Sequence, residues 1–298
     1  MSFVEAEIAS QPELWARAAE LADSPAVAGA LPPIGARVAV VGCGTSLYMA
    51  RAWAALREAA GHGETDAFAA SEFPPTRTYD HVLAITRSGT TTEILRLLST
   101  LSATTTGTST VITTGADLPA TREARQSVLL PFADEQSVVQ TRFATSTLAL
   151  LRAHLGDDLT AAISDARSEL DRPVPTAAVG QRQFSFLGRG WTVGLAEEAA
   201  LKSREAAQAW TEAYPAMEFR HGPISVVDEG SLVWIFGAAP DGLVDQITQT
   251  GALVVTSDAD PMAHLVGAQR LAVALAQSRG LDPDAPRNLT RSIVLSDA

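Results

Sequence analysis

The chain has 298 residues, 46% of them hydrophobic, which suffices for one large domain or two modest ones, and we expect two. Its 22 basic and 34 acidic residues give a formal net charge of −12, which argues against sequence-independent binding to nucleic acid or to anionic membranes, so a phosphorylated ligand must be held locally. The lack of a run of ~18 apolar residues, the acidic N-terminus and the single cysteine, Cys43, predict a cytoplasmic protein without membrane span, secretion signal or disulfide.

A helix is expected near the N-terminus, over residues 10–22 (SQPELWARAAELA). Ser10 has the residue type of an N-cap, Pro12 stands in the first turn, and Glu13 adds an acid to that turn. We therefore set residues 1–27 apart as a helical segment that packs on the first domain or on a partner.

Residues 28–172 are predicted to form an α/β domain. Short apolar or β-branched runs alternate there with helical stretches, as in a parallel sheet; the runs are 38–42, 65–70, 82–86, 109–114 and 127–132. A long helical region follows from about 134 to 170, and the prolines of DRPVP (171–175) end it. We place the domain boundary at this point.

The second half looks like another copy of the first. Strands are expected at 184–188, 231–237 and 252–258, within a second domain over 173–285. Both halves open with a strand, a G-x-G turn and a helix, VVGCGTSLYMARAW at 40–53 and FLGRGWTVGLAEEA at 186–199, which suggests an internal duplication. The next turn differs, because TRSGTTTE in the first half corresponds to GAAPDGLV, which lacks hydroxyls, in the second.

Two turns rich in serine and threonine follow strands of the first half, CGTS (43–46) and TRSGTT (86–91). In an open parallel sheet, ligands bind at the carboxyl ends of the strands, where hydroxyls, free N–H groups and helix dipoles meet. Together with Arg87, which can make a charge-assisted contact, these groups suit a phosphate dianion.

Other interpretations of these turns are open at this point. The hydroxyls can be ordinary helix caps, and Gly89 can merely relieve backbone strain. A dinucleotide site is disfavoured because GCGTS lacks the third glycine and the expected acid, and no Walker motif occurs. Cys43 has no local histidine to activate it, and the five histidines lack metal-ligand spacing, so we expect no structural metal.

Acid–base candidates lie in EEAALKSREAAQAW (197–210). Helical spacing puts Glu198, Lys202 and Glu205 on one face, where a partly desolvated carboxylate beside a lysine could abstract a proton near neutral pH. An exposed ion pair is the plain alternative. His221, within FRHGP, is a second candidate, although a lone histidine is more often structural.

Several strings in this order resemble the double sugar-isomerase (SIS) domain family, as in the isomerase half of glucosamine-6-phosphate synthase and in related amino-sugar-phosphate isomerases and deaminases. The strings are EIASQP, VVGCGTS, ASEFP, TRSGTTTE, EQSVVQTRFAT, FLGRG, EEAALKSREAAQAWTEAYPAMEFRHGP and DAPRNLTRSI. The resemblance covers nearly the whole chain. It implies two tandem three-layer αβα domains with flavodoxin-like parallel sheets, and a tail over residues 286–298 that closes over the substrate.

The resemblance further implies a homodimer that binds hexose or hexosamine 6-phosphates without metal or organic cofactor. It assigns Glu205 as the base that moves a proton between C1 and C2, with Lys202 beside it, and His221 as the ring-opening residue supplied by the neighbouring subunit. The positions that it implies for substrate and phosphate binding are Gly44, Thr45, Ser46, Thr86, Arg87, Ser88, Thr91, Glu135, Val138 and Arg291.

Two departures from the synthase pattern bear on the reaction. The tail lysine that can form a Schiff base is here Arg291, whose guanidinium is a poor nucleophile, and Arg87 replaces a glutamine. From the resemblance we expect isomerisation with deamination of an amino-sugar 6-phosphate, started by proton abstraction at C2, although the loss of the tail lysine makes elimination a serious alternative. The alternatives are a lyase that eliminates water from an N-acetylhexosamine 6-phosphate, and a non-catalytic sugar-phosphate sensor, which the absence of a basic helix-turn-helix segment disfavours.

Overall fold

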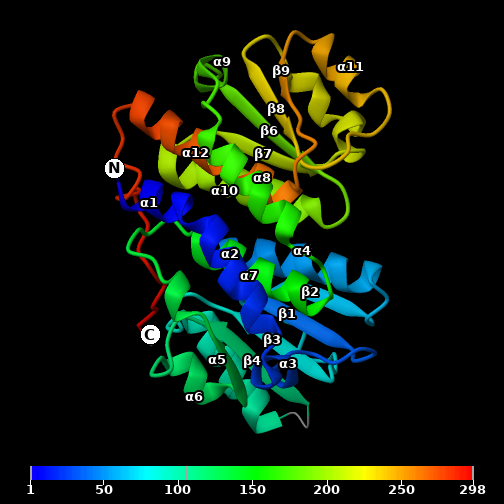
Figure 1. The fold of residues 1–298 in the computed structure, drawn as a ribbon, viewed down its shortest axis with the longest axis vertical. Coiled ribbons are helices and arrows are strands. Elements are labelled where there is room, and N and C mark those ends of the chain that lie inside the picture. Colours follow the sequence, from blue (N-terminus) through cyan, green and yellow to red (C-terminus); the bar gives the residue numbers. More distant parts are fainter. Residues whose placement is uncertain (1, 105–106, 297–298) are drawn as a thin grey trace. The chain divides into compact units, whose positions relative to one another are not determined.

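The computed structural model describes residues 2–104 and 107–296, which fold into two compact units, each built around its own parallel sheet (Figure 1). The five-stranded unit comprises residues 13–135, 142–159 and those from 290 onward. The four-stranded unit comprises residues up to 12, 136–141 and 160–289. Across the two described ranges, no helix combines the length and the apolarity that a bilayer span requires.

The five-stranded sheet has the order β2-β1-β3-β4-β5, and all its neighbours are parallel. Its strands are β1 (Val38–Gly42), β2 (Thr65–Ala69), β3 (His81–Ile85), β4 (Thr108–Thr113) and β5 (Gln126–Leu129). The five strands predicted from the sequence are confirmed, although the last one is shorter than expected. Pro131 ends that run, because it begins the 3₁₀ turn η2 (Pro131–Ala133).

Helices cover both faces of this sheet. They are α2 (Gln11–Ala22, largely in this unit), α3 (Pro25–Ala30), α4 (Thr45–Ala59), α5 (Thr92–Thr104), α6 (Pro119–Glu123) and α7 (Arg142–His154), with the 3₁₀ turn η1 (Ala70–Glu72) after β2. Ala39 and Val41 of β1 pack with Ile94 and Leu98 of α5. Alternate β1 residues point to the opposite face, and α4, which contacts β1, packs with α7.

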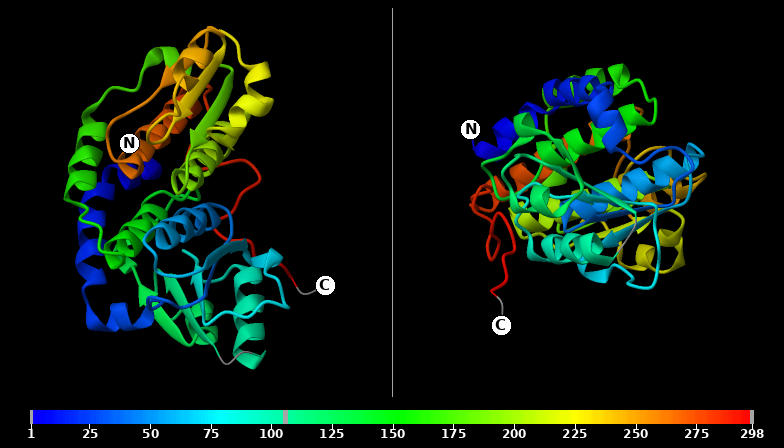
Figure 2. Two further views of the ribbon diagram at one scale, coloured as in Figure 1. Left: turned by 90° about the vertical axis from the view of Figure 1, so that its right-hand side faces the viewer. Right: turned by 90° about the horizontal axis from the view of Figure 1, so that it is seen from below.

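The four-stranded sheet has the order β7-β6-β8-β9, again all parallel. Its strands are β6 (Gln183–Gly188), β7 (Thr211–Pro215), β8 (Ser231–Ile235) and β9 (Leu253–Val255). The remaining elements are α1 (Phe3–Ala9), α8 (Thr160–Asp171), α9 (Thr176–Val179), α10 (Thr192–Ala207), η3 (Glu218–His221), η4 (Pro223–Val226), α11 (Leu243–Thr248) and α12 (Pro261–Ser278). Leu243 of α11 packs on one face, and Trp234 of β8 stacks on His264 of α12 on the other; Figure 2 gives two further views of these layers.

The first strand-to-helix connection has the same geometry in both sheets. Gly44 and Gly190 have φ angles of 55° and 57°, in the left-handed region that glycine adopts without strain. At the strand ends, a Cβ on Gly42 would lie 2.5 Å from the carbonyl carbon of Ser46, and one on Gly188 would lie 2.2 Å from the carbonyl oxygen of Thr192. Strand order and these close approaches are what an internal duplication would produce.

Three sequence-based expectations differ from the structure. The helical region expected over 134–170 is two helices, α7 and α8, with irregular chain at 134–141 and a break at Gly156, whose φ is 92°. Strand β7 was not predicted. Ser10, expected as an N-cap, is the C-cap residue of α1, and its hydroxyl donates to the Glu7 carbonyl at 2.8 Å, while Pro12 and Glu13 do stand in the first turn of α2.

The compact units interleave along the chain. The four-stranded unit takes in the N-terminal residues and the short segment 136–141, and the five-stranded unit takes in the C-terminal tail. The sequence analysis drew continuous segments, 28–172, 173–285 and 286–298, with an N-terminal helix over 1–27. The compact units are defined by packing, whereas the predicted domains were continuous stretches of chain. The structure therefore does not test the predicted domain bounds.

Candidate functional site

The turn after β3 is a compact polar loop. Thr86 Oγ1 accepts a hydrogen bond from the Gly89 N–H at 3.3 Å, which closes the turn before α5 begins. Gly89 has a φ of 61°, and a Cβ there would lie 2.7 Å from the Leu118 Cβ. Glycine is therefore required both by the backbone conformation and by the space, so its role goes beyond relief of strain.

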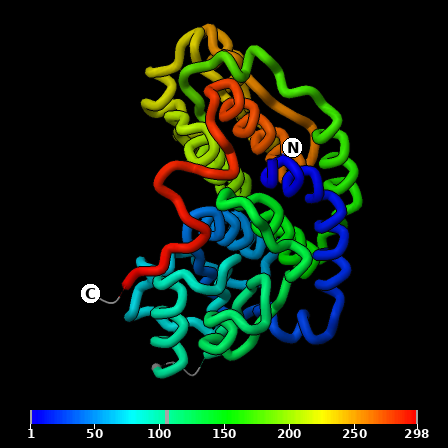
Figure 3. The backbone as a smooth tube through the Cα atoms, turned by 90° about the vertical axis from the view of Figure 1, so that its left-hand side faces the viewer, coloured from blue at the N-terminus to red at the C-terminus, as the bar shows by residue number. Residues whose placement is uncertain are grey.

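Three hydroxyls of this turn converge on one oxygen atom. Ser88 Oγ and Thr90 Oγ1 donate to Ser292 Oγ at 3.1 and 2.9 Å, and Thr91 Oγ1 lies 3.4 Å from the same atom. The Thr92 N–H, in the first turn of α5, donates to the Ile293 carbonyl at 3.1 Å. Figure 3 traces this tail (red). The tail thus supplies oxygens to a set of donors at a helix N-terminus, which is the kind of site that binds anions. We call Ser88, Thr90, Thr91 and Thr92 the hydroxyl cradle.

The second hydroxyl turn, after β1, lies beside the cradle, because β1 pairs with β3 along their lengths. Gly44 precedes α4, and Thr45 and Ser46 are buried in its first turn. The Ser46 N–H donates to the Cys43 carbonyl at 3.2 Å, so it already has a partner. Burial, reinforced by the nearby Glu93 carboxylate, raises the pKa of the Cys43 thiol to about 11, which disfavours a thiolate nucleophile.

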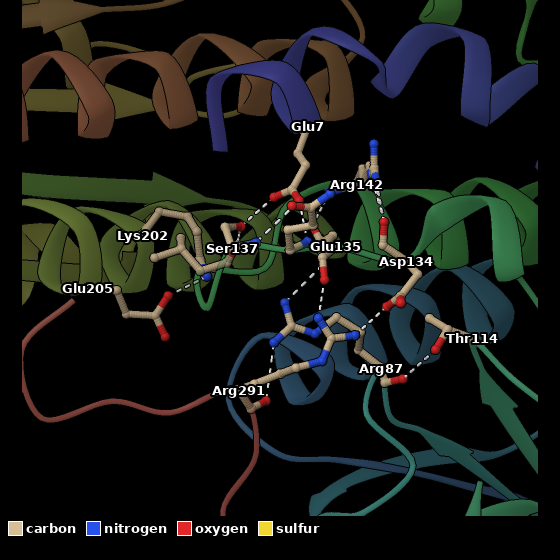
Figure 4. Close-up of polar contacts among 12 residues, drawn as sticks. Glu7, Arg87, Thr114, Asp134, Glu135, Ser137, Arg142, Lys202, Glu205 and Arg291 are labelled. Carbon is tan, nitrogen blue, oxygen red and sulfur yellow. Dashed lines mark hydrogen bonds and ion pairs between the residues drawn. The ribbon is translucent and has the colours of Figure 1, made fainter. Parts of the chain in front are cut away.

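Arg87 directs its charge at a carboxylate of its own unit. Its side chain is 1% exposed, and its guanidinium donates to Glu135 Oε2 at 3.2 Å and to the Arg291 carbonyl at 3.1 Å (Figure 4). The Arg87 carbonyl accepts the hydroxyls of Thr113 and Thr114 at 3.3 and 3.0 Å. The contact with an anion expected from the sequence stays a prediction. What the structure shows is a buried ion pair that fixes the turn.

Glu135 connects three parts of the five-stranded unit. Its Oε1 accepts the N–H of Arg142, the first residue of α7, at 2.8 Å, where the helix dipole favours a carboxylate. The Arg291 guanidinium contacts both the Glu135 carbonyl and the Asp134 carboxylate. Arg291 and Arg87 therefore hold the tail and the 134–135 loop together from both sides.

A buried ion-pair cluster lies on α10 of the four-stranded unit. Lys202 is 1% exposed, and its ammonium lies 3.5 Å from Glu198 Oε1 and 2.5 Å from Glu205 Oε2. The Glu198 side chain is fully buried, whereas that of Glu205 is 19% exposed. The alternative of an exposed surface ion pair is therefore wrong for Lys202. Glu205 is the carboxylate of this cluster that solvent, and so a ligand, can reach.

The end of α10 is fixed by the chain that follows it. Gln208 takes a left-handed conformation with φ 52°, and its N–H donates back to the last turn of α10. Thr211 Oγ1, at the start of β7, donates to the Ala200 carbonyl at 2.8 Å, and Arg279 donates to the Ala207 carbonyl at 2.7 Å. Glu205 therefore projects from a helix end held by side chains.

The remaining predicted residues lie apart from these clusters. His221 ends η3 with its side chain exposed, followed by Gly222 with φ 150°, and it takes no part in the ion pairs of α10. Val138 lies half-buried in the irregular segment 136–141. Ser292 and Asp134 were missed, and Thr90 was part of the predicted hydroxyl turn TRSGTT but was not assigned to binding. Ser292 stands in the quoted string DAPRNLTRSI, but nothing in a sequence pairs it with a turn some 200 residues earlier.

A polar cavity of about 490 Å³ opens in the four-stranded unit, between α8 and the residues after β9. Its lining residues are Asp165, Ser168, Glu169, Arg172 and 256–259, none of which was predicted to be functional. Within the ranges that the structure covers, no three side chains of His, Cys, Asp or Glu are grouped as metal ligands would be.

Comparison with known proteins gives two kinds of similarity. No family model matches the chain. The chain is 28% identical over 300 residues to the glutamine–fructose-6-phosphate aminotransferase (isomerizing) of Sulfolobus acidocaldarius. This match covers 87% of this chain and 50% of that protein. It is also 31% identical over 192 residues to the same enzyme of Neisseria meningitidis, in a match that covers 50% of this chain and 31% of that protein. The chain thus spans about half, or less, of the length of these relatives.

Solved structures share the fold over almost the full length. Glucosamine-6-phosphate deaminase from Thermotoga maritima superposes with a TM-score of 0.83, 24% identity and coverage of 99% of this chain and all of that one. Tagatose-6-phosphate ketose/aldose isomerase from Escherichia coli gives 0.80, 18% identity and coverage of 99% and 97%. The chain therefore has the α/β fold of SIS phosphosugar isomerases and is homologous to the isomerase region of the glutamine–fructose-6-phosphate aminotransferases.

Proposed function

We propose that this protein is an enzyme that acts on an amino-sugar 6-phosphate, of the glucosamine 6-phosphate or N-acetylglucosamine 6-phosphate class, by isomerisation with deamination. The observation that carries the proposal is the buried Lys202, paired with two carboxylates of which Glu205 alone is partly exposed. The homology to sugar-phosphate aminotransferases and the hydroxyl cradle support the substrate class. The two sheets then correspond to two tandem SIS domains.

In this mechanism the substrate phosphate binds the hydroxyl cradle, where hydroxyls and the N-terminus of α5 donate to it. The Glu205 carboxylate removes the proton from C2 of the open-chain sugar, and the electron pair of the C–H bond moves into an enolate or enolamine. Lys202 stays protonated and steadies both the carboxylate and the negative charge that develops. A proton delivered at C1 completes the isomerisation to a 2-imino sugar, and hydrolysis of that imine by water releases ammonia and leaves a ketose phosphate.

His221 and the oligomeric state belong to the same proposal. We assign His221 the opening of the sugar ring, because an imidazole can pass a proton to and from the ring oxygen near neutral pH. Its exposed position at the end of η3 suits a residue that serves the site of a second subunit in a homodimer. Glu135 and Arg291 are expected to fix the loop and the tail that contact the sugar.

Elimination is the second candidate, and Arg291 favours it. Deamination through a Schiff base needs an amine nucleophile, whereas the guanidinium at this tail position is already bound to Asp134 and to the Glu135 carbonyl. The same C2 carbanion can instead expel a C3 hydroxyl as water, which gives an unsaturated sugar. Both reactions begin with proton removal by Glu205, and they differ in the next step, which is protonation at C1 for the deaminase and loss of the C3 hydroxyl for the lyase.

The test is a panel of hexosamine 6-phosphates, with and without the N-acetyl group, incubated in deuterated water. For the true substrate we expect exchange of the C2 proton for deuterium in the recovered substrate, and deuterium at C1 of a ketose product. Release of ammonia supports the deaminase, and a product lighter by one water supports the lyase. Stabilisation of the fold by a sugar phosphate without exchange or product would contradict both and leave a sensor.

A further inference from the structure

The N-terminal helix α1 contributes a buried carboxylate that the proposed mechanism does not use. Glu7 is 3% exposed, although α1 has only seven residues. Its Oε1 accepts the N–H groups of Gln136 and Ser137 at 2.5 and 3.3 Å, and its Oε2 accepts the hydroxyl of Ser137 (Figure 4). One side chain thus binds three donors of a single short segment.

That segment, residues 136–141, forms no helix or strand. The Ser137 hydroxyl also donates to the Val139 carbonyl at 2.7 Å, so Glu7 and Ser137 together hold two N–H groups before Val138 and one carbonyl after it. A chain without regular backbone hydrogen bonds takes its conformation from such side-chain contacts. Glu7 is therefore well placed to determine the backbone conformation of residues 136–141.

Helix α1 is held firmly enough to act as the fixed partner. Ser2 and Glu5 form a capping box at its start, and the Asp284 carboxylate accepts the N–H groups of Phe3 and Val4 at 2.7 and 2.8 Å. These contacts lie at the opposite end of α1 from segment 136–141. The helix would consequently keep its place if the contacts of Glu7 were lost.

We propose that Glu7 is a positioning residue for the reaction, which acts through segment 136–141 and Val138. The inference rests on the proposed function, in which this segment contacts the sugar of the bound phosphosugar. It gives the string EIASQP a physical role, because its glutamate is Glu7. We call the contacts of Glu7 with Gln136 and Ser137 the clamp. A displacement of binding groups by about 1 Å can lower a rate on the order of 10²-fold, so removal of the clamp is expected to lower kcat/KM for the sugar phosphate.

The chemistry of the clamp allows a conservative rescue. In Glu7→Gln the amide oxygen still accepts the two N–H groups, and the amide nitrogen can donate to Ser137 Oγ, whose own proton then serves the Val139 carbonyl. In Glu7→Leu the N–H groups of Gln136 and Ser137 lose this acceptor, and the Ser137 hydroxyl keeps the Val139 carbonyl but loses its contact with the carboxylate. A control on the same helix is Glu5→Ala, which removes the capping box and the contact to Gln277 but touches none of segment 136–141.

The experiment measures kcat and KM for the hexosamine phosphate found in the substrate panel, and Kd for inorganic phosphate, at a temperature where circular dichroism shows every variant folded. For Glu7→Leu we expect kcat/KM to fall about 10- to 100-fold with the phosphate Kd unchanged. Glu7→Gln is expected to stay within about threefold of the wild type, and so is Glu5→Ala despite a lower Tm.

The inference is overturned if Glu7→Leu lowers only the Tm, or if it weakens the binding of inorganic phosphate as much as that of the sugar phosphate. If Glu7→Leu does not fold, Ser137→Ala, which removes one of the three contacts, is expected to lower kcat/KM by about threefold to tenfold, and an unchanged value again overturns it. Hydrogen exchange at the Gln136 and Ser137 amides is independent of turnover. Faster exchange in Glu7→Leu supports the clamp even if the proposed reaction fails, and unchanged exchange contradicts it.

Discussion

The two units share a strand order and a first strand-to-helix connection, yet each carries a different kind of polar group. In the five-stranded unit the turn after β3 presents hydroxyls, while the corresponding chain after β8, residues 236–240, has none. Conversely, aligning Gly42 with Gly188 places Ala52, Leu56 and Ala59 of α4 where α10 has Glu198, Lys202 and Glu205.

Under the proposed function, the five-stranded unit binds the phosphate and the four-stranded unit supplies the base, so one scaffold separates binding from chemistry. Thr192, which aligns with Ser46, uses its hydroxyl inside the four-stranded unit, where it accepts the Arg189 N–H at 2.8 Å and donates to the Phe236 carbonyl at 3.0 Å. The strand ends of that unit therefore serve packing. Its buried ion-pair cluster lies instead on helix α10, where Lys202 contacts the carboxylates of Glu198 and Glu205.

The largest effect is expected from Glu205→Gln. An amide cannot accept the C2 proton, so kcat should fall by about 10³-fold or more, within the range of general-base catalysis, while the Kd for inorganic phosphate stays unchanged. Steady-state kinetics and phosphate titration measure the two quantities separately. Unchanged turnover in this variant would contradict the proposal that the four-stranded unit supplies the catalytic base.

A second prediction concerns the glycines at the two strand ends. Gly42→Ala and Gly188→Ala each push a Cβ to within 2.5 Å or less of helix backbone, so each should lower the free energy of unfolding by about 3 kcal/mol in urea titrations. Gly29→Ala, in α3 with open space around its Cβ, is the control and should be neutral or stabilising by up to about 1 kcal/mol. A cost below about 1 kcal/mol at one strand end alone would show that the connections are not equivalent.

A third prediction uses one buried histidine in each unit. Burial lowers the pKa of His81, at the start of β3, to about 4, and that of His264, stacked on Trp234, to about 3. Because these values lie below the ordinary 6.5, the unfolded chain binds more protons, and stability falls as the pH drops below about 6.5. Each histidine should lower the free energy of unfolding by about 2 kcal/mol between pH 7 and pH 5.

Urea titrations at pH 7 and pH 5 check this, with His264→Phe as the test variant. Phenylalanine keeps an aromatic ring against Trp234 but binds no proton, so the loss of stability between the two pH values should shrink by about 2 kcal/mol. An equal loss in wild type and variant would mean that His264 is already protonated, or exposed, in the folded protein.

The sequence predicted the strands well because β1 and β3 are buried runs of apolar residues, as central parallel strands are. Strand β7 was not predicted because TEAYP is a short edge strand with no run of apolar residues, and it closely follows the helical region. Spacing placed Glu198, Lys202 and Glu205 on one face, but it could not tell burial from exposure. The sequence also could not reveal the partners of Arg87, because Glu135 and Arg291 are distant in the chain and contact Arg87 only in the folded protein.

The smallest effect is expected from single hydroxyls, and it tests the comparison most directly. Thr90→Val removes one donor of the hydroxyl cradle and should raise the Kd for inorganic phosphate about tenfold, because a hydrogen bond to a charged group contributes on the order of 1.5–3 kcal/mol. Thr192→Val removes a hydroxyl of the other unit, so it should leave the phosphate Kd unchanged but lower the free energy of unfolding by about 1–2 kcal/mol, since the Arg189 N–H and the Phe236 carbonyl lose a partner. Isothermal titration with phosphate and urea unfolding separate the two outcomes. If Thr192→Val weakened phosphate as much as Thr90→Val, the anion would bind the strand ends of both units, and the loss of hydroxyls after β8 would not mark a loss of binding.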